Sequence, residues 1–277
     1  MANIGILHPG SMGILVAATA QNSGHRVYWI SVGRSIQTFE RAAKLGILDA
    51  GTLKELCATC EVIVSICPPY AAEEVAEQVA AHAFQGIYLE ANAISPQRTI
   101  RIGERMKTAG ARVVDGCIIG SPSWLYLSGE AAGEVAAFFS ANPLETYVLD
   151  GNIGKASALK MCHAAYTKGT GALLCAILAA ADALSVREDL EKEWSRAGSD
   201  FTEKTRARVL HVTPKAWRFA GEMDEIAATF REVGLPGEFH AAAGMIYRRM
   251  AGFKDASSTP VLEEVLEVLL HPNHKPD

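Results

Sequence analysis

The sequence predicts an α/β protein in which a domain with a mostly parallel sheet, residues 1–150, precedes an all-helical domain, residues 151–277. Short apolar strands alternate with helical segments through the first part of the chain. This alternation is typical of a parallel sheet whose crossovers are right-handed. After the last apolar strand, near residue 149, the sequence contains only helical patterns and loops. The fold class therefore follows from a change of pattern near the middle of the chain.

Buried strands and amphipathic helices alternate in the first domain. The segment 61–66 is the most apolar strand, and Cys67-Pro68-Pro69 ends it because proline cannot donate a hydrogen bond within a sheet. The expected strands are 3–7, 25–30, 61–66, 87–90, 112–117 and 147–149. The expected helices are 11–22, 39–45, 53–57, 71–83 and 96–109.

One long helix opens the second domain. The segment 156–185 is rich in alanine and leucine, and small or apolar residues surround most of its circumference. Such a helix must be buried on several sides, so we expect a homodimer. Shorter helices are expected at 188–196, 223–233, 240–251 and 261–270.

The bulk composition is that of a globular protein with a substantial core. The chain has 277 residues, 49% hydrophobic residues and a net charge of -5. No run of lysine and arginine indicates a nucleic-acid partner, and we expect neither a targeting segment nor a membrane span. The six cysteines, including the pair in Cys57-Ala58-Thr59-Cys60, are expected to be free thiols of a cytoplasmic protein without a metal site.

A glycine-containing loop joins the first strand to the first helix. Its sequence is His8-Pro9-Gly10-Ser11-Met12-Gly13. Aligned with G-x-G-x-x-G, it keeps the second and third glycines, and His8 replaces the first. The unsatisfied N–H groups at the start of a helix bind a pyrophosphate. Because the loop lies between a strand and a helix, it predicts a Rossmann dinucleotide-binding domain.

The end of the second strand indicates which dinucleotide binds. An NAD site usually has an acidic residue there for the ribose 2′-hydroxyl, but the segment 29–35 has none. Arg34 offers a permanent planar cation that suits a 2′-phosphate, and Ser31 and Ser35 offer hydrogen bonds. We therefore expect NADP rather than NAD.

Several motifs resemble the β-hydroxyacid dehydrogenase superfamily, which includes 6-phosphogluconate and 3-hydroxyisobutyrate dehydrogenases and, more distantly, imine reductases. They are Gly10-Ser11-Met12-Gly13, Ala93-Ile94-Ser95-Pro96 and residues 154–160. Residues 217–249 resemble the short C-terminal domain of a branch similar to phosphogluconate dehydrogenase. The resemblance implies that Cys67, Pro68 and Pro69 lie beside the adenosine ribose, and that Asn92 and Ala93 lie beside the nicotinamide ribose.

The resemblance also implies that residues 115–121 face the substrate. The candidates there are Cys117, Gly120 and Ser121. Family members usually carry a serine and two glycines where this chain has Ile119-Gly120-Ser121. Either Ser121 replaces that serine, or the substrate lacks the corresponding carboxylate contact. The segment 121–127, with Trp124 and Tyr126, is expected to form a loop that shapes an aromatic, roomy pocket.

Lys160, on the long helix, is the main catalytic candidate. The resemblance implies a general base in alcohol oxidation and a general acid in the reverse direction, and a partly desolvated ammonium can exchange a proton near neutral pH. His163 and Thr167 follow on the same helical face, with His163 where the family usually has asparagine. Glu222, just before the helix expected at 223–233, and His240 are further candidates for substrate binding.

We therefore expect an NADP-dependent oxidoreductase that transfers hydride between the nicotinamide and a small hydroxy acid, or its aldehyde or keto form. Lys160 would act as the general acid or base. Two alternatives stay open. An imine reductase usually lacks this lysine, and a non-catalytic NADP-binding or sensing protein would tolerate the altered His8-Pro9 turn and the altered substrate loop.

Overall fold

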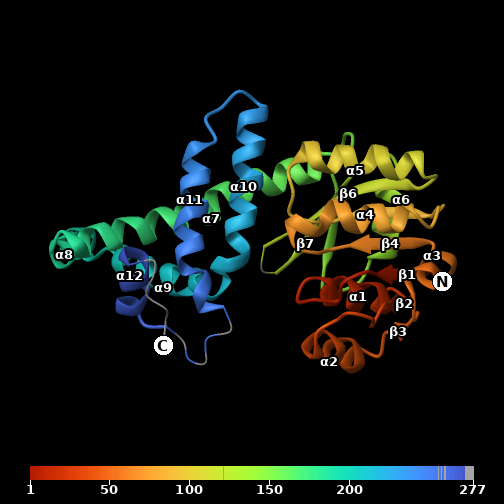
Figure 1. Ribbon diagram of the computed structural model, residues 1–277, viewed down its shortest axis with the longest axis horizontal. Coiled ribbons are helices and arrows are strands. Elements are labelled where there is room, and N and C mark those ends of the chain that lie inside the picture. Colours follow the sequence, from red (N-terminus) through yellow and green to blue (C-terminus); the bar gives the residue numbers. More distant parts are fainter. Residues whose placement is uncertain (121, 255, 257, 259, 272–277) are drawn as a thin grey trace. The chain divides into compact units, whose positions relative to one another are not determined.

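We describe a computed structural model of the chain. It describes every residue except 121, 255, 257, 259 and 272–277. The chain forms two compact units, Met1–Met161 and Cys162–Asp277, and the boundary falls inside the long helix α7 (Lys155–Ala183). Figure 1 shows the strands gathered in the first unit and helices in the second.

The first unit is built on an eight-stranded sheet with the order β3-β2-β1-β4-β5-β6-β7-β8. Strands β6 and β7 pair antiparallel, and the other neighbouring strands pair in parallel. This confirms the predicted α/β class with a mostly parallel sheet. The strands are β1 (Asn3–Ile6), β2 (Arg26–Trp29), β3 (Leu48–Asp49), β4 (Val62–Ser65), β5 (Ile87–Glu90), β6 (Arg112–Ile119), β7 (Trp124–Ser128) and β8 (Glu145–Val148).

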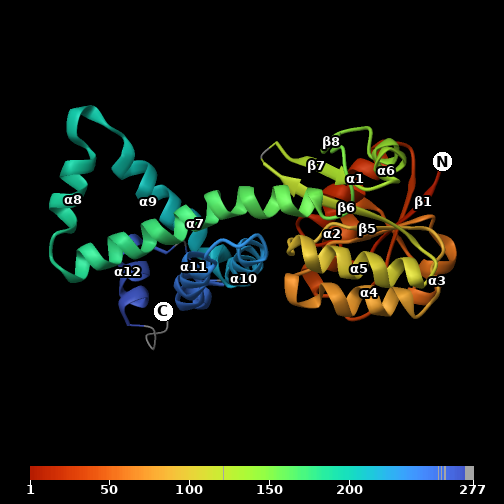
Figure 2. The ribbon, with the colours of Figure 1, turned by 90° about the horizontal axis from the view of Figure 1, so that it is seen from above.

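Helices cover both faces of this sheet. One face packs against α1 (Gly13–Asn22), α2 (Ile36–Leu45) and α6 (Ala132–Phe138). The other packs against α3 (Leu53–Thr59), α4 (Ala72–Ala80) and α5 (Pro96–Thr108). Figure 2 shows α4 and α5 on one side of the sheet and α1 and α6 on the other. A 3-10 turn at Pro69–Ala71 precedes α4.

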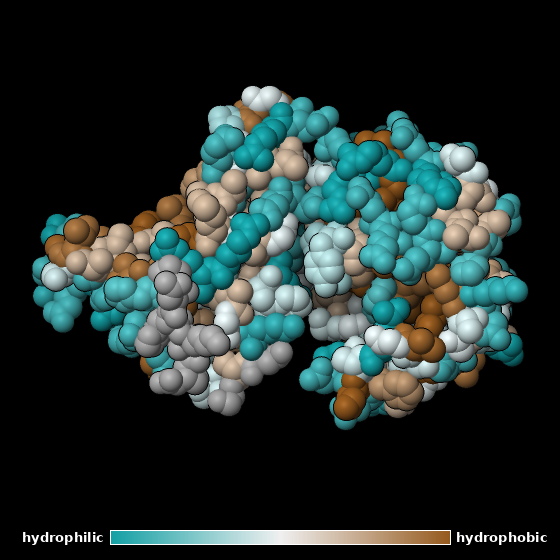
Figure 3. Space-filling model, viewed as in Figure 1, coloured by the Kyte–Doolittle hydropathy of each residue, from teal (hydrophilic) through white to brown (hydrophobic). Residues whose placement is uncertain are grey.

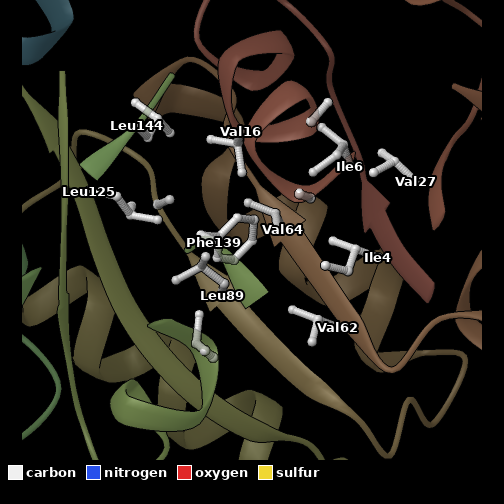
Figure 4. Close-up of a cluster of buried hydrophobic side chains, with 14 of the residues drawn as sticks. Ile4, Ile6, Val16, Val27, Val62, Val64, Leu89, Leu125, Phe139 and Leu144 are labelled. Carbon is white, nitrogen blue, oxygen red and sulfur yellow. The ribbon is translucent and has the colours of Figure 1, made fainter. Parts of the chain in front are cut away.

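The core under α1 joins apolar side chains from distant parts of the chain. Figure 4 shows Ile4 and Ile6 of β1 close to Val16 of α1 and Val64 of β4. Leu125 of β7 belongs to the same buried cluster, as do Phe139 and Leu144 beyond it. The cluster holds the amino end of α1 against the end of β1, where the dinucleotide loop lies.

The segment expected to be a loop around Trp124 and Tyr126 is a strand, so this prediction was wrong. Ile119 of β6 pairs directly with Trp124 of β7, so the connection between them is short. Leu125 and Leu127 are fully buried in the core, whereas Trp124 and Tyr126 on the opposite face are half-buried. This alternation of buried and half-buried residues, with a period of two, is the pattern of a strand.

The second unit contains the rest of α7 together with α8 (Arg187–Trp194), α9 (Phe201–Val212), α10 (Ala216–Glu232), α11 (Glu238–Arg249) and α12 (Leu262–Leu270). Short 3-10 turns lie at Arg196–Gly198, Thr213–Lys215 and Met250–Phe253. Helices α10 and α11 run side by side in Figures 1 and 2. The all-helical character predicted for this part of the chain is confirmed.

Two details of this unit differ from the prediction. Helix α9 was not expected, because its buried positions include Thr202 and Thr205 as well as Val209 and Val212, which weakens the apolar pattern. Helix α10 begins at Ala216 rather than 223, so Glu222 lies inside a helix and not at its start.

Within the described residues, α7 is the one helix long and apolar enough to span a membrane by length and composition. Half of its most apolar window is buried inside the protein.

Candidate cofactor and active site

The dinucleotide loop turns sharply between β1 and α1. The Gly10 N–H donates to the His8 carbonyl at 2.8 Å, which closes the turn without the first glycine of the fingerprint. A Cβ atom on Gly13 would lie 2.1 Å from the same carbonyl oxygen, so only glycine fits there. A Cβ on Gly10 would meet nothing within 4 Å, which leaves space beside the backbone for a ligand. The two retained glycines therefore have different physical roles.

The start of α1 presents unsatisfied donors. Among the described residues, the backbone N–H groups of Ser11, Met12 and Gly13 have no backbone acceptor, and the N-cap residue Met12 provides no side-chain cap. These groups and the positive end of the helix dipole could hold a pyrophosphate. Pro9 has no N–H group and therefore adds no further donor to the loop.

His8 and Arg34 lie together beside this loop. An Nη atom of Arg34 donates to the Leu7 carbonyl at 3.0 Å, while its Nε atom is buried with no partner among the described residues. His8 Nδ1 is likewise buried and unpartnered within that part of the chain. Burial, and secondarily the charge of Arg34, lowers the pKa of His8 to about 4, so the imidazole is neutral at physiological pH. Both side chains have polar atoms left for a ligand.

A cavity of about 270 Å³ opens at this point. Its walls are largely apolar, as suits an adenine ring, and His8 and Arg34 provide the polar edge. The residues that line it are Leu7, His8, Ile30, Val32, Arg34, Gly51, Thr52, Leu53, Val75, Gln78 and Val79. Of the predicted cofactor contacts, this cavity thus brings His8 and Arg34 together.

The two serines near Arg34 are used within the protein. Ser35 caps α2, since its hydroxyl accepts the Thr38 N–H at 3.3 Å. The Ser31 N–H donates to the carboxylate of Asp49 at 3.3 Å, and hydrogen bonding by Ser31 lowers the pKa of Asp49. Asp49 was not among the expected site residues, because a two-residue strand, β3, brings it beside β2. The Gly51 N–H also donates to Asp49, at 3.0 Å. The sequence feature that could have indicated Asp49 is the glycine turn that follows it.

A buried polar network ties together the ends of β4 and β5. Asn92 Oδ1 accepts the Cys67 N–H at 2.5 Å, and Asn92 Nδ2 donates to Ser65 at 3.0 Å. Glu90 accepts the Asn92 N–H at 3.0 Å. Both polar atoms of the Asn92 side chain are therefore bonded to the end of β4 and the residues that follow it. Ala93 and the Pro68-Pro69 turn are surfaces that could contact a ribose. Burial raises the pKa of Cys67 to about 12, so it is a thiol.

Glu90 is the most unusual member of this network. It is 1% exposed, and its Oε2 atom has no hydrogen-bond partner among the described residues. Burial raises its pKa to about 8; hydrogen bonds from Asn92 oppose the shift and the charge of Asp115 adds to it. Glu90 is therefore mostly protonated at neutral pH.

Lys160 reaches back from α7 to the sheet. Its ammonium donates to the carbonyl of Ile118, near the end of β6, at 2.6 Å. Cys117, one residue earlier, is 1% exposed, and burial raises its pKa to about 12. Gly120 has φ +91°, and a Cβ there would lie 2.8 Å from the Pro122 carbonyl. The predicted substrate contact Ser121 lies outside the described residues. The structure thus joins Lys160 to the predicted substrate segment.

The remaining predicted residues belong to the helical unit. His163 is exposed, and the Thr167 hydroxyl donates to its carbonyl at 3.1 Å. His240 is buried between Phe230 and Phe239, with ring centroids 4.3 and 5.2 Å away, and burial lowers its pKa. These contacts surround His240 with aromatic rings within this unit.

Glu222 is paired inside the same unit. Its carboxylate forms a buried ion pair with Lys168, whose ammonium also lies 4.7 Å from the centroid of the Phe219 ring. Tyr247 donates to the Lys168 carbonyl at 2.7 Å. Lys168 was not among the expected site residues, although a lysine within a largely apolar helix indicates a charged partner.

Among the described residues, no group of three or more His, Cys, Asp or Glu side chains could hold a metal ion. All six cysteines are free, and burial raises the pKa values of Cys57 and Cys60 to about 11 and about 12. The cysteine pair therefore lacks the stabilised thiolate of a redox motif.

The fold and the dinucleotide loop together define an NAD(P)-dependent dehydrogenase or reductase. Residues 3–143, more than half of the chain, match the family model of the NAD binding domain of 6-phosphogluconate dehydrogenase. The chain belongs to this family. Residues 181–250 match a domain of unknown function, DUF1932. The resemblance to the β-hydroxyacid dehydrogenase superfamily, in a branch with a short C-terminal domain, is thereby confirmed.

Known proteins extend this similarity over nearly the whole chain. An uncharacterised 28.5 kDa protein of Methanothermus fervidus is 28% identical over 183 residues, 64% of this chain and 71% of that protein. A conserved protein of unknown function, described as structurally similar to 3-hydroxyacid dehydrogenases, is 27% identical with a TM-score of 0.67, covering 91% of this chain and 97% of its own. The 3-hydroxyisobutyrate dehydrogenase of Mycobacterium tuberculosis, solved with L-serine, shares the fold at 15% identity, with a TM-score of 0.69 and coverage of 97% and 99%.

Proposed function

We propose that the protein is an NADP-dependent oxidoreductase that transfers hydride between the nicotinamide and a small hydroxy acid or its aldehyde or keto form. The observation that carries the proposal is Lys160, whose ammonium lies 2.6 Å from the Ile118 carbonyl at the end of β6. In a Rossmann domain, ligands bind at the carboxyl ends of the parallel strands. Reduction of a carbonyl requires a proton donor beside the bound substrate, and Lys160 lies at this edge of the sheet.

The cofactor would accept or supply the hydride, and the protein would orient the reactants and move the proton. In the reductive direction, the Lys160 ammonium would donate a proton to the carbonyl oxygen of the substrate. In oxidation, the neutral amine would take the proton of the alcohol. Ile118 holds the ammonium in place until the substrate oxygen replaces its carbonyl as the acceptor.

The preference for NADP rests on Arg34. Its guanidinium lines the cavity beside the loop, with a buried Nε atom that has no partner among the described residues. Such a group favours a phosphate. Asp49 acts in the opposite direction, because a carboxylate beside Ser31 repels a 2′-phosphate. Since two backbone N–H groups already satisfy Asp49, we give Arg34 the greater weight.

A small hydroxy acid is the substrate class that the relatives favour. The structural relative from Mycobacterium tuberculosis is a 3-hydroxyisobutyrate dehydrogenase solved with L-serine. 3-Hydroxyisobutyrate and L-serine each carry a hydroxyl and a carboxylate. Residues of the substrate segment, Cys117, Gly120 and Ser121, are proposed to shape specificity. His163 and Thr167, on the turns of α7 after Lys160, are proposed as further substrate contacts, as are Glu222 and His240 of the helical unit.

An imine reductase is the second candidate. The presence of Lys160 speaks against it, because a proton donor of this kind is not a usual feature of that class. A non-catalytic NADP-binding or sensing protein is the third candidate, which the replacement of the first glycine by His8 would permit.

One experiment separates these candidates. Consumption of NADPH is measured against a panel of small aldehydes, keto acids and cyclic imines, with the wild-type protein and Lys160→Ala in parallel. We expect turnover of an aldehyde or keto acid that Lys160→Ala loses. Turnover that survives the substitution refutes the proton-transfer role, preference for an imine favours imine reduction, and tight NADPH binding without any turnover favours the sensor.

We also propose a cytoplasmic homodimer that binds neither nucleic acid nor a membrane. The support is an apolar stripe that follows α7 and continues into the turn directly after it, where Tyr166, Leu173 and Leu184 are 68%, 43% and 72% exposed. Figure 3 shows apolar side chains along the carboxyl half of this helix. A second copy of the chain would cover them. Light scattering should give twice the 29.6 kDa of one chain, and Leu184→Glu, but not Ile36→Glu on α2, should give the monomer. A monomeric wild-type protein at micromolar concentration would contradict the dimer.

A further inference from the structure

Side chains of the sheet hold the first turn of α7. The carboxylate of Asp115, on β6, accepts the N–H groups of Gly154 and Ser157 through one oxygen, at 2.9 and 3.0 Å. The Ser128 hydroxyl, on β7, accepts the Ala156 N–H at 3.0 Å. The orphan donors at the start of a 29-residue helix are thus satisfied by residues far away in the sequence.

The same carboxylate is the centre of a buried network. The hydroxyls of Ser157 and Ser128 donate to Asp115 at 2.7 and 3.0 Å. Thr99, on α5, lies 2.8 Å from the Ser157 hydroxyl and must be the donor, since the Ser157 proton is already given to Asp115. Asp115 is 0% exposed. A buried carboxylate that accepts four hydrogen bonds at the positive end of a helix has a single favourable position.

Two side chains of α7, Ser157 and Lys160, contact β6 at two positions that follow each other in the same order along both elements. Ser157 is bonded to Asp115, and three residues further along both elements, Lys160 is bonded to Ile118. Three residues advance a strand by about 10 Å but a helix by only about 4.5 Å. The lysine side chain bridges the difference. The place where its ammonium arrives is therefore determined by where Asp115 fixes the helix start.

We propose that Asp115 is a positioning residue, which fixes the first turn of α7 and thereby sets the Lys160 ammonium at the end of β6. The proposal deepens the proposed function and rests on it for the role of Lys160 in turnover. The positional part does not depend on turnover, because it concerns the contact between Lys160 and Ile118 alone. Misplacement of a reacting group by about 1 Å can reduce a rate roughly 100-fold.

The positional part is tested by the reactivity of Lys160 toward trace acetic anhydride, measured by mass spectrometry in wild type, Asp115→Asn and Asp115→Ala. Asparagine keeps one oxygen acceptor in the same place, so we expect acetylation of Lys160 to rise several-fold in Asp115→Ala and less in Asp115→Asn. Lys44, which is exposed on α2 and outside the network around Asp115, is the internal control and should not change. Unchanged reactivity of Lys160 in a folded variant overturns the proposal.

Should Asp115→Ala fail to fold, Ser157→Ala provides the test, since it removes one hydrogen bond to Asp115 and retains the backbone donor. The catalytic part is tested by a double-mutant cycle on NADPH-dependent turnover. Asp115→Asn should lower kcat and leave the NADPH Kd unchanged, and in a Lys160→Ala background, assayed at high enzyme concentration, it should lower the residual kcat no further. An equal loss in both backgrounds refutes action through Lys160. A fully active Lys160→Ala refutes the proposed function and leaves the acetylation result to decide the positional claim.

Discussion

The carbonyl oxygen of His8 occupies the space that a side chain on Gly13 would need, since a Cβ atom there would lie only 2.1 Å from it. The chain replaces the first glycine of the dinucleotide fingerprint and keeps the third. The turn at His8 thus depends on a bare Gly13 at the start of α1. A Cβ atom on Gly10, three residues earlier, would meet nothing within 4 Å.

These two glycines give a matched pair of variants. Gly13→Ala should lower the free energy of unfolding by about 1–3 kcal/mol, because the loop must move to admit the methyl group. Gly10→Ala should change it by less than about 0.5 kcal/mol but weaken NADPH binding, because its methyl group enters the space left for the ligand. Urea unfolding and fluorescence titration measure the two effects. A stable Gly13→Ala with normal NADPH affinity would contradict the loop geometry.

Arg34 and Asp49 should shift cofactor preference in opposite directions. Loss of a charge-assisted contact in Arg34→Ala should raise the NADPH Kd by about tenfold and leave the NADH Kd nearly unchanged. Asp49→Asn should lower the NADPH Kd, since it removes the nearby negative charge. Calorimetric titration of both cofactors into each variant checks this. Equal losses for NADH and NADPH in Arg34→Ala would show that Arg34 does not read the 2′-phosphate.

Glu90 should make stability depend on pH. Its folded pKa of about 8 exceeds the ordinary 4.5, so between these values the native state keeps a proton that the unfolded state loses. The free energy of unfolding should therefore fall as pH rises, by about 3 kcal/mol from pH 4.5 to 7. Glu90→Gln should remove this loss and be more stable than wild type at pH 8, with little difference at pH 4.5. Parallel denaturant curves with the same pH slope in both proteins would refute the assignment.

The pair Lys168–Glu222 should behave as a buried ion pair. Glu222→Ala leaves the Lys168 ammonium without its carboxylate partner and should cost about 3 kcal/mol of stability. The double variant Lys168→Met/Glu222→Leu should recover most of this loss, because it removes both charges and keeps the volume. Urea unfolding of wild type, Glu222→Ala and the double variant measures these differences. A double variant that is no more stable than Glu222→Ala would contradict the assignment of a buried ion pair.

Local pattern was sufficient for most of the fold and for the dinucleotide loop. Apolar strands, helix periodicity and the two glycines at Gly10 and Gly13 are properties of short segments, and the structure agrees with them. The alternation in β7 was equally local, but the expectation of a substrate loop there obscured it. Helix α9 was missed because Thr202 and Thr205 take buried positions that an apolar pattern would have marked.

Residues whose environment depends on distant partners could not be read in this way. Asp49 reaches Ser31 only through the pairing of β2 with β3. Asn92 is expected beside the nicotinamide ribose, and the partners of its side chain, Ser65 and Cys67, lie 27 and 25 residues away in the sequence. Glu222 of α10 pairs with Lys168 of α7, 54 residues earlier in the chain. In each case the partner of the side chain lies on another element. The sequence of a single segment therefore does not indicate which contact the side chain makes.

The central claim is that this protein transfers hydride while Lys160 exchanges the proton. The most direct test is transfer of deuterium from NADPH, deuterated at the reactive carbon of the nicotinamide, into the reduced product, with wild type compared with Lys160→Met. We expect deuterium in the alcohol carbon of a small hydroxy acid from the wild-type protein, and a variant that binds NADPH normally but forms almost no product. Product formed at the wild-type rate by Lys160→Met, or product without deuterium, would contradict the account.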